Sequence, residues 1–185
     1  DAEKRAQLRK ELNLEDALVL GTVGRLSFSK NHEFLIELLK EIRKSHPKVK
    51  LLIIGEGDLR GALETQIQEN GLEDAVLLLG WKSNVEDYLQ AMDIFLLPSR
   101  FEGLGIAAVE AAASGLPAVV SDQVPEDVAF TENVRHVPLE LPLWTRTLEE
   151  LAELSCNRGE GVEVVRAAGY DVRRQAKVLE ALYQE

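Results

Sequence analysis

Short, almost continuously apolar runs recur along the chain, and branched side chains dominate them. Strands that are buried on both faces have this composition, as in parallel sheets, whereas a strand with one wet face alternates apolar and polar residues. The pattern therefore predicts five buried strands and a weaker sixth one, at 17–23, 49–54, 75–79, 94–97, 118–120 and 134–137.

Between these runs, apolar residues recur at the spacing of an amphipathic helix. Asp58 and Asn84 each precede such a segment and are expected to cap its start, while Gly71 and Gly115 are expected to end one. The spacing predicts helices over 3–12, 34–42, 59–67, 84–90, 105–114, 143–157 and 170–184.

Strands and helices alternate, which predicts an α/β fold with a doubly wound parallel sheet and helices on both faces. Six strands favour the order 3-2-1-4-5-6, in which the first and fourth strands are neighbours. Ligands of such sheets bind outside the carboxyl ends of these two strands. We therefore expect the unusual chemistry in the loops that follow Val23 and Leu97.

Composition narrows the possible functions. The 185 residues are enough for one core and too few for two ordinary domains, so 1–185 is expected to be a single domain. Lys and Arg number 21 against 32 Asp and Glu, which gives a formal charge of −11. A broad attraction to nucleic acid or anionic lipid is disfavoured, and any anion site must be local.

Cysteine content and hydropathy point to the compartment. The single cysteine, Cys156, excludes an internal disulfide framework and is expected to be an inert packed thiol. No apolar run approaches the roughly 18 residues of a membrane span, so we expect a cytoplasmic protein. The chain begins at Asp1 rather than Met, from which we expect a piece of a longer protein.

The loop after the first strand carries Gly24, Arg25 and Lys30 together with two serine hydroxyls. It leads into a helix whose first amides lack intrahelical partners, a combination that favours a diphosphate. A solvated turn with ordinary surface charges explains it equally well. The loop has neither the Walker pattern nor the third glycine of a dinucleotide fingerprint, which disfavours a nicotinamide enzyme.

The loop after the fourth strand is rich in glycine and carries a carboxylate. Gly103 and Gly105 let the backbone turn sharply and approach a ligand closely. Glu102 stands at the edge of this loop, and Glu110 lies two turns into the following helix. A carboxylate accepts both hydroxyls of a vicinal diol, so this pair is typical of a site for ribose or another sugar.

Two further loops reach the same edge of the predicted sheet. The turn Gly55-Glu56-Gly57 either admits a ligand or is a plain tight connection. Gly80 and Trp81 follow the third strand. We expect Trp81 to be a partly buried wall of the site rather than a platform on which a base stacks.

In combination, these segments resemble the C-terminal, donor-binding domain of a retaining glycosyltransferase of family 4, with the GT-B fold. The motifs are most similar to those of bacterial capsular or exopolysaccharide transferases. The resemblance runs from residue 19 to residue 183. It rests on Gly24-Arg25 with Lys30, Gly55-Glu56-Gly57, Leu79-Gly80-Trp81, the stretch 91–99, Glu102-Gly103-Leu104-Gly105 and the stretch 110–117.

The resemblance implies a role for each matching position. Arg25 and Lys30 would hold the nucleoside diphosphate and stabilise it as it leaves, and Glu102 would meet the hydroxyls of the donor sugar. These three are the expected catalytic residues. The expected donor-binding residues are Gly24, Gly55, Gly57, Gly80, Trp81, Gly103, Leu104, Gly105, Ile106 and, for the ribose hydroxyls, Glu110.

The resemblance also implies transfer with retention of anomeric configuration from a UDP- or GDP-sugar, without a metal or other cofactor. The sequence is consistent with this, because no Asp-x-Asp pair falls on these loops. His32, His46 and His136 have no ligand partner at metal spacing and are expected at the surface or in packing.

Two departures from the family pattern concern the donor sugar. Leu104 stands where the family often has phenylalanine, and residues 123–126 stand where many members have paired glycines. The acceptor-binding N-terminal domain is expected to be absent from this chain, which would then fold alone but transfer little sugar. In many relatives that domain also supplies a histidine near the anomeric carbon.

Two other functions stay open at this point. One is a stand-alone nucleotide or phosphosugar binding module with a regulatory role. The other is a GT-B relative with different chemistry, such as a nucleotide-sugar epimerase, which the fold alone does not exclude.

Overall fold

The fold is built on one six-stranded parallel sheet. The computed structural model describes residues 1–128, 133–154 and 158–183. The strands lie in the order β3-β2-β1-β4-β5-β6, and every neighbouring pair is parallel. This confirms the predicted fold class and strand order. The strands are β1 (Val19–Val23), β2 (Lys50–Ile54), β3 (Val76–Gly80), β4 (Ile94–Leu97), β5 (Ala118–Ser121) and β6 (Val134–Val137).

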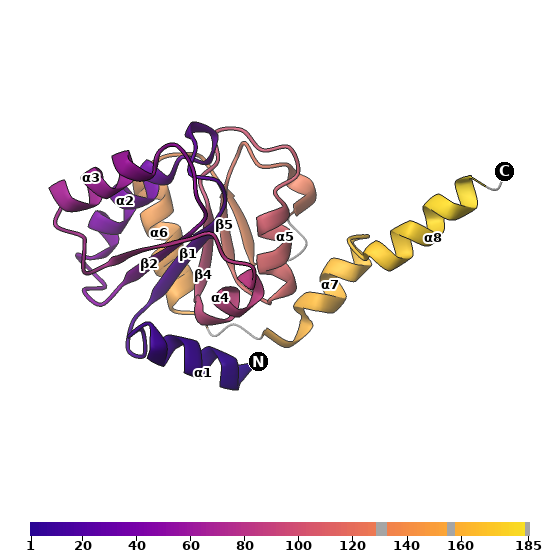
Figure 1. Cartoon of the computed structure of the whole chain (residues 1–185), viewed down its shortest axis with the longest axis horizontal. Coiled ribbons are helices and arrows are strands. Elements are labelled where there is room, and N and C mark those ends of the chain that lie inside the picture. Colours follow the sequence, from indigo (N-terminus) through magenta and orange to yellow (C-terminus); the bar gives the residue numbers. More distant parts are fainter. Residues whose placement is uncertain (129–132, 155–157, 184–185) are drawn as a thin grey trace.

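Helices cover both faces of this sheet (Figure 1). The α-helices are α1 (Ala2–Glu11), α2 (His32–Ile42), α3 (Arg60–Glu69), α4 (Val85–Ala91), α5 (Ile106–Ala113), α6 (Leu141–Ala152), α7 (Gly161–Ala167) and α8 (Val172–Leu182). Three short 3-10 helices complete the described secondary structure: η1 (Phe28–Lys30), η2 (Glu126–Val128) and η3 (Arg158–Glu160). Figure 1 shows α8 extending away from the rest of the domain.

Each strand contributes to two cores because successive side chains point to opposite faces. In β1, Leu20 packs with α2, α3 and α6, whereas Val19 packs on the face covered by α4 and α5. In β4, Leu96 belongs to the first core and Phe95 to the second. Burial on both faces explains why the central strands are almost continuously apolar rather than apolar at every second position.

The helices differ from the prediction mainly at their ends. Helix α6 begins earlier and ends earlier than the predicted segment 143–157, and Cys156 lies outside the described residues. Helix α7 was not predicted, because its seven residues span fewer than two turns and are too short to show a helical period. Gly71 follows the end of α3 with a φ of 62°, as expected for a glycine that closes a helix.

Two predicted helix caps were wrong. The Asp58 side chain does not cap α3, because it forms an ion pair with Arg25 at 3.2 Å, and Leu59 stands at the cap position. Asn84 stands at the cap of α4 but makes no capping hydrogen bond. Its amide nitrogen donates instead to the side chain of Asp87 at 3.0 Å.

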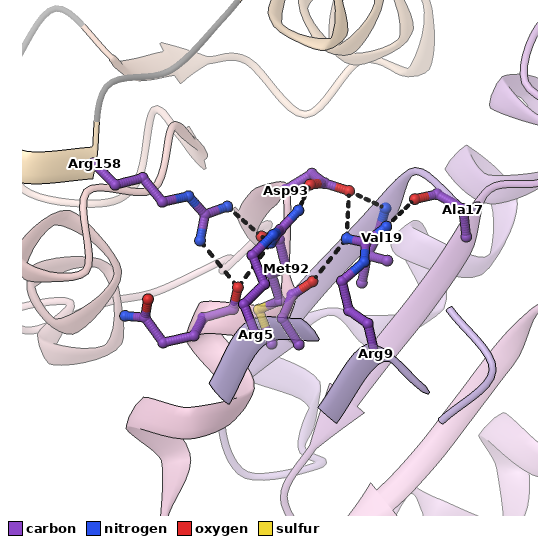
Figure 2. A network of polar contacts seen from close by, with 9 residues as sticks. Arg5, Arg9, Ala17, Val19, Met92, Asp93 and Arg158 are labelled. Carbon is purple, nitrogen blue, oxygen red and sulfur yellow. Dashed lines mark hydrogen bonds and ion pairs between the residues drawn. The ribbon is translucent and has the colours of Figure 1, made fainter. Parts of the chain in front are cut away.

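An arginine network ties α1 to the start of β4 at the amino edge of the sheet (Figure 2). Asp93 accepts from Arg5 at 2.5 Å and from Arg9 at 3.1 Å. The same carboxylate accepts from the backbone N–H of Val19 at 2.8 Å. Arg5 and Arg158 also donate to carbonyl oxygens at the end of α4, where the helix dipole favours positive charge. The network therefore fixes how α4 delivers the chain into β4.

A cavity of about 460 Å³ lies beside this network and is lined in part by Arg5, Asp93, Leu151 and Arg158. Because its two guanidinium groups already donate to backbone oxygens, we assign no ligand to it.

In the described part of the chain, no helix has both the length and the apolar character needed to span a bilayer.

Candidate nucleotide-sugar site

The site lies where the sheet changes direction. Strands β1 and β4 pair through Leu20 with Ile94 and Gly21 with Phe95, and their carboxyl ends point to the same edge. The chain leaves β1 toward β2 on one side and leaves β4 toward β5 on the other. The two loops expected to carry the chemistry are therefore neighbours, as predicted.

We call residues 24–31, which follow β1, the cationic loop. Its backbone continues the hydrogen bonding of the sheet, since the N–H of Gly24 donates to Ile54 at 2.9 Å and that of Leu26 donates to Glu56 at 2.9 Å. The Leu26 side chain is fully buried and anchors the loop. Asn31 has a φ of 57° and joins η1 to the start of α2. The loop is thus held rigidly against its neighbours.

The Gly55-Glu56-Gly57 turn supports the cationic loop from behind. Gly55 has a φ of 143°, and a Cβ there would lie 1.9 Å from the carbonyl oxygen of Gly24. A Cβ on Gly57 would lie 2.3 Å from the carbonyl oxygen of Leu26. Close packing between two backbones explains both glycines. Direct contact of Gly55 and Gly57 with a donor stays a prediction.

We call residues 99–105, which follow β4, the acidic turn. Its Glu102 carboxylate meets the cationic loop, accepting from Lys30 Nζ at 2.5 Å. The Ser99 hydroxyl donates to the same oxygen, Oε2, at 3.0 Å. The carbonyl of Ser99 in turn accepts from the buried Ser121 hydroxyl on β5 at 2.5 Å. The structure thus joins residues 72 positions apart into one hydrogen-bonded unit.

This ion pair is largely shielded from solvent. The Lys30 and Glu102 side chains are 23% and 12% exposed. A pair this well shielded is less weakened by salt than a surface pair. In the free protein, the two charges that the sequence assigns to donor binding neutralise each other.

Arg25 lies apart from that pair. It bonds to Asp58 at 3.2 Å, and the two side chains are 69% and 87% exposed. Surface ion pairs of this kind contribute at most about 1 kcal/mol, so little energy opposes a different position of the guanidinium. The structure does not place Arg25 against Lys30 or Glu102.

The acidic turn ends in a glycine-led helix start. A Cβ on Gly103 would meet no protein atom within 4 Å, so nothing in the described chain requires glycine there. Gly105 has a φ of 74°, which favours glycine, and it caps α5. Leu104 and Ile106 beside it are 43% and 61% exposed. These residues present backbone amides and apolar surface at the edge of the sheet.

Glu110 lies further along α5, close enough to Glu86 of α4 to interact with its charge. Partial burial raises the pKa of the Glu110 carboxyl, and the nearby charge of Glu86 raises it further. Glu110 makes no direct contact with Glu102 among the interactions of the described residues. The two glutamates therefore stand at separate points of the edge, as their separate predicted roles require.

Trp81 differs from the expectation. The residue is 73% exposed and so is not a partly buried wall. It follows Gly80, whose φ of 71° turns the chain out of β3, and a Cβ on Gly80 would lie 2.7 Å from Glu56 Oε1. The turn directs the indole toward solvent. Its face is available for stacking.

Sequence reasoning missed two contributors to this edge. Arg100, in the acidic turn, donates to the cationic loop, and Ser99 holds Glu102. Ser99 ends the stretch 91–99 that carries the resemblance and Arg100 directly follows it, but neither residue type signals a role there. His32 is 1% exposed at the start of α2, in accord with the packing role expected for it. Within residues 1–128, 133–154 and 158–183 no three His, Cys, Asp or Glu side chains gather as a metal site.

Comparison with known families identifies the family of the chain. The family model of glycosyl transferases group 1 matches residues 3–157. This range contains the cationic loop after β1 and the acidic turn after β4. The chain belongs to the glycosyl transferases group 1. It is a domain of the GT-B type.

Curated relatives of this group 1 domain are longer proteins. EpsF of Bacillus subtilis strain 168 is 32% identical over 172 residues, which are 91% of this chain and 45% of EpsF. The alpha-D-kanosaminyltransferase of Streptomyces kanamyceticus is 29% identical over 98% of this chain and 49% of that protein. The chain spans about half the length of these relatives.

Solved structures of glycosyltransferases share the fold. HepE of Anabaena, crystallised with UDP and glucose, superposes with a TM-score of 0.84 over 100% of this chain and 53% of HepE, at 21% identity. WaaG, named for lipopolysaccharide biosynthesis, superposes with a TM-score of 0.76 over 93% of this chain and 48% of WaaG, at 22% identity. At such identities the likeness shows the fold alone.

Proposed function

We propose that this group 1 domain binds a nucleoside diphosphate sugar and serves a retaining glycosyltransferase of polysaccharide or other glycoconjugate synthesis. The observation that carries the proposal is the contact between Lys30 and Glu102 at 2.5 Å, between the loops after β1 and β4. A phosphate-binding cation and a hydroxyl-binding carboxylate side by side match the two parts of such a donor, which meet at the anomeric carbon.

The charges of the site suit a diphosphate leaving group. In the proposed complex, the diphosphate takes the Lys30 ammonium, and Arg25 turns from Asp58 to the same anion. Positive charge held in a partly shielded site stabilises the negative charge that grows as the sugar departs. These two cations do the work that a metal ion does in other transferases, and we propose that the domain needs no metal or other cofactor.

The carboxylates suit the hydroxyl groups of the donor. Once the diphosphate has taken Lys30, Glu102 has free lone pairs for hydroxyls of the sugar, while Ser99 still orients it. Glu110 accepts from the ribose, and the open space at Gly103 lets the donor approach the backbone. Trp81, with its exposed face, borders the base.

Relatives guide the choice of the first probe. HepE was crystallised with UDP-glucose, and an Escherichia coli relative that is 36% identical over 110 residues is named as using UDP-Gal. Both names point to uridine donors, so UDP-sugars are tested before GDP- and ADP-sugars.

We propose that the acceptor binds to a separate domain and that this chain alone transfers little sugar. Chemistry that excludes water requires two walls that close on the donor. We place the protein in the cytoplasm, with that second domain at the inner face of the membrane. Product analysis of a protein that contains both domains tests the reaction, its retention of configuration and the epimerase alternative.

A titration tests donor binding directly. Backbone amide signals of the isotope-labelled chain are recorded while UDP-, GDP- or ADP-glucose is added, with EDTA present to test the need for metal. We expect the signals of Lys30, Gly103 and Glu110 to shift with one of the three. No shift at these positions with any of them contradicts the proposal.

Matched lysine variants sharpen this test. Lys30→Met should weaken binding about tenfold or more, because a charged hydrogen bond to the phosphates is lost. Lys48→Met is the control, because Lys48 pairs only loosely with Asp16, at 3.7 Å on an exposed surface. Equal affinity in the two variants would place the diphosphate elsewhere.

A further inference from the structure

Arg100 makes an unusual number of contacts for a residue in a surface turn. It lies at the start of the acidic turn, two residues before Glu102. Its backbone N–H donates to the carbonyl of Ser29 at 2.7 Å, and its Nη1 donates to the carbonyl of Phe28 at 2.9 Å. Both acceptors belong to the cationic loop, just before Lys30.

The other side of the same guanidinium reaches the helix that follows. Nη2 of Arg100 donates to Glu33 Oε1 at 3.0 Å, on the first turn of α2. The guanidinium carbon lies 4.3 Å from the centre of the Phe28 ring. One planar group therefore engages a carbonyl, a carboxylate and an aromatic face. A lysine ammonium, as a point charge on a flexible stem, does not reproduce this fork.

These contacts set the spacing of the groups that the donor would meet. Lys30 follows the Ser29 contact by one residue, and Glu102 follows Arg100 by two. Beyond the pairing of β1 with β4 and the hydrogen bonds that hold the cationic loop to Ile54 and Glu56, contacts made directly between the two loops set their relative position. A misplacement of about 1 Å in such a site is enough to weaken function strongly.

We propose that Arg100 is a positioning residue that holds the cationic loop at the distance from the acidic turn that a nucleoside diphosphate sugar requires. The proposal rests on the proposed function for the identity of the ligand. The clamp itself is a property of the free chain and has a test of its own.

The test uses two substitutions and one matched control. Arg100→Gln removes the fork and the charge, and Arg100→Lys keeps the charge without the fork. Arg43→Gln is the control, because Arg43 also bridges two segments, with hydrogen bonds to both oxygens of Asp74 at 3.1 and 3.0 Å. Arg43 follows α2 and Asp74 precedes β3, at the amino edge of the sheet and away from the site.

The first readout is hydrogen exchange without nucleotide. The amides of Lys30 and of position 100 donate to Ser27 and Ser29, so their exchange reports on the loop itself. We expect exchange at both amides to become about tenfold faster in Arg100→Gln and in Arg100→Lys, and to stay at the wild-type rate in Arg43→Gln. Unchanged exchange at both amides in both Arg100 variants overturns the proposal, whether or not any nucleotide binds.

The second readout is the dissociation constant for whichever of UDP-, GDP- and ADP-glucose the wild-type chain binds most tightly. We expect it to rise about tenfold in both Arg100 variants and less than twofold in Arg43→Gln, at comparable free energies of unfolding. Wild-type affinity in the Arg100 variants overturns the proposal. If the wild-type chain binds none of the three, the proposed function fails, while the exchange rates still decide whether the clamp exists.

Discussion

His32 makes the stability of this domain depend on pH in a window where few other groups act. The residue opens α2 directly behind the cationic loop and is 1% exposed. Burial lowers the pKa of the imidazole from its ordinary value of 6.5 to about 4. This value includes smaller effects of the Glu33 charge, which raises the pKa, and of the Lys30 charge, which lowers it. Its Nδ1 has no hydrogen-bond partner among the described residues, so the described surroundings offer little to a protonated ring.

The magnitude follows from proton linkage. Between pH 6.5 and 4 the unfolded chain binds a proton at His32 that the folded chain does not, so stability falls as the pH falls. A tenfold difference in proton affinity is worth about 1.4 kcal/mol. The lowered pKa of His32 therefore contributes at most about 3 kcal/mol to the pH dependence of the free energy of unfolding. We expect about 2 kcal/mol of this to be lost between pH 7 and pH 4.5.

Two acids mark the limits of the measurement. The pKa of Asp74 is lowered, chiefly by its hydrogen bonds from Arg43, so its contribution is lost only as the pH falls below its ordinary value of 3.8. The raised pKa of Glu110 acts in the opposite direction to His32, because the folded state then holds a proton more tightly than the unfolded state. The comparison of two proteins over the same pH range therefore isolates His32 better than one curve does.

Urea denaturation at several pH values between 4.5 and 7.5 measures the effect. We expect the free energy of unfolding of the wild type to fall by about 2 kcal/mol more than that of His32→Gln between pH 7 and pH 4.5. His46→Gln shows how much of the difference comes from the removal of any histidine. Parallel curves for the wild type and His32→Gln would refute the reasoning.

Three further predictions concern packing, the donor and the arginine network. Gly57→Ala puts a Cβ 2.3 Å from the Leu26 carbonyl oxygen and should lower the free energy of unfolding in urea by about 1–3 kcal/mol, whereas Gly61→Ala, in open space on α3, should raise it by up to about 1 kcal/mol. The reverse order contradicts the packing argument. Glu110→Gln should weaken nucleotide binding in calorimetry about tenfold at unchanged stability, and unchanged affinity would make it a bystander. Asp93→Asn should cost about 2 kcal/mol in thermal unfolding, and no loss means that its arginines are held by backbone oxygens alone.

The sheet was predictable because its strands are apolar on both faces. Adjacent residues such as Val19 and Leu20 are buried in different cores. Both neighbours are buried in this way only in a sheet that helices cover on both sides. The strand order then followed from the number of strands and the handedness of their connections. The predicted helix caps were wrong for a different reason. Asp58 suits a helix start, but Arg25 competes for its carboxylate, and that contact joins residues 33 positions apart.

Only the part of the site that follows from the strand order could be predicted from the sequence. Placing β1 beside β4 was enough to bring Lys30 and Glu102 to one edge, and the structure shows them bonded. The exposure of Trp81 depends on how the chain leaves β3, and the role of Arg100 depends on acceptors about 70 residues away in the sequence. Neither feature produces a hydrophobic periodicity, a residue spacing or a composition that can be recognised in a single sequence.

The charge of the chain and the charge of its proposed ligand have the same sign, which bears on where affinity comes from. A protein of formal charge −11 repels a diphosphate at long range, but at physiological salt such repulsion fades over about 8 Å. The donor must therefore be held by contacts at short range, and the cation that serves it is already paired with Glu102. Binding exchanges one partner of Lys30 for another, so only a ligand that also satisfies the released carboxylate gains the full energy of the exchange. The nucleoside diphosphate product lacks the sugar hydroxyls that we propose for Glu102 and a nucleotide sugar has them, so we expect the pair to favour the complete donor over its product.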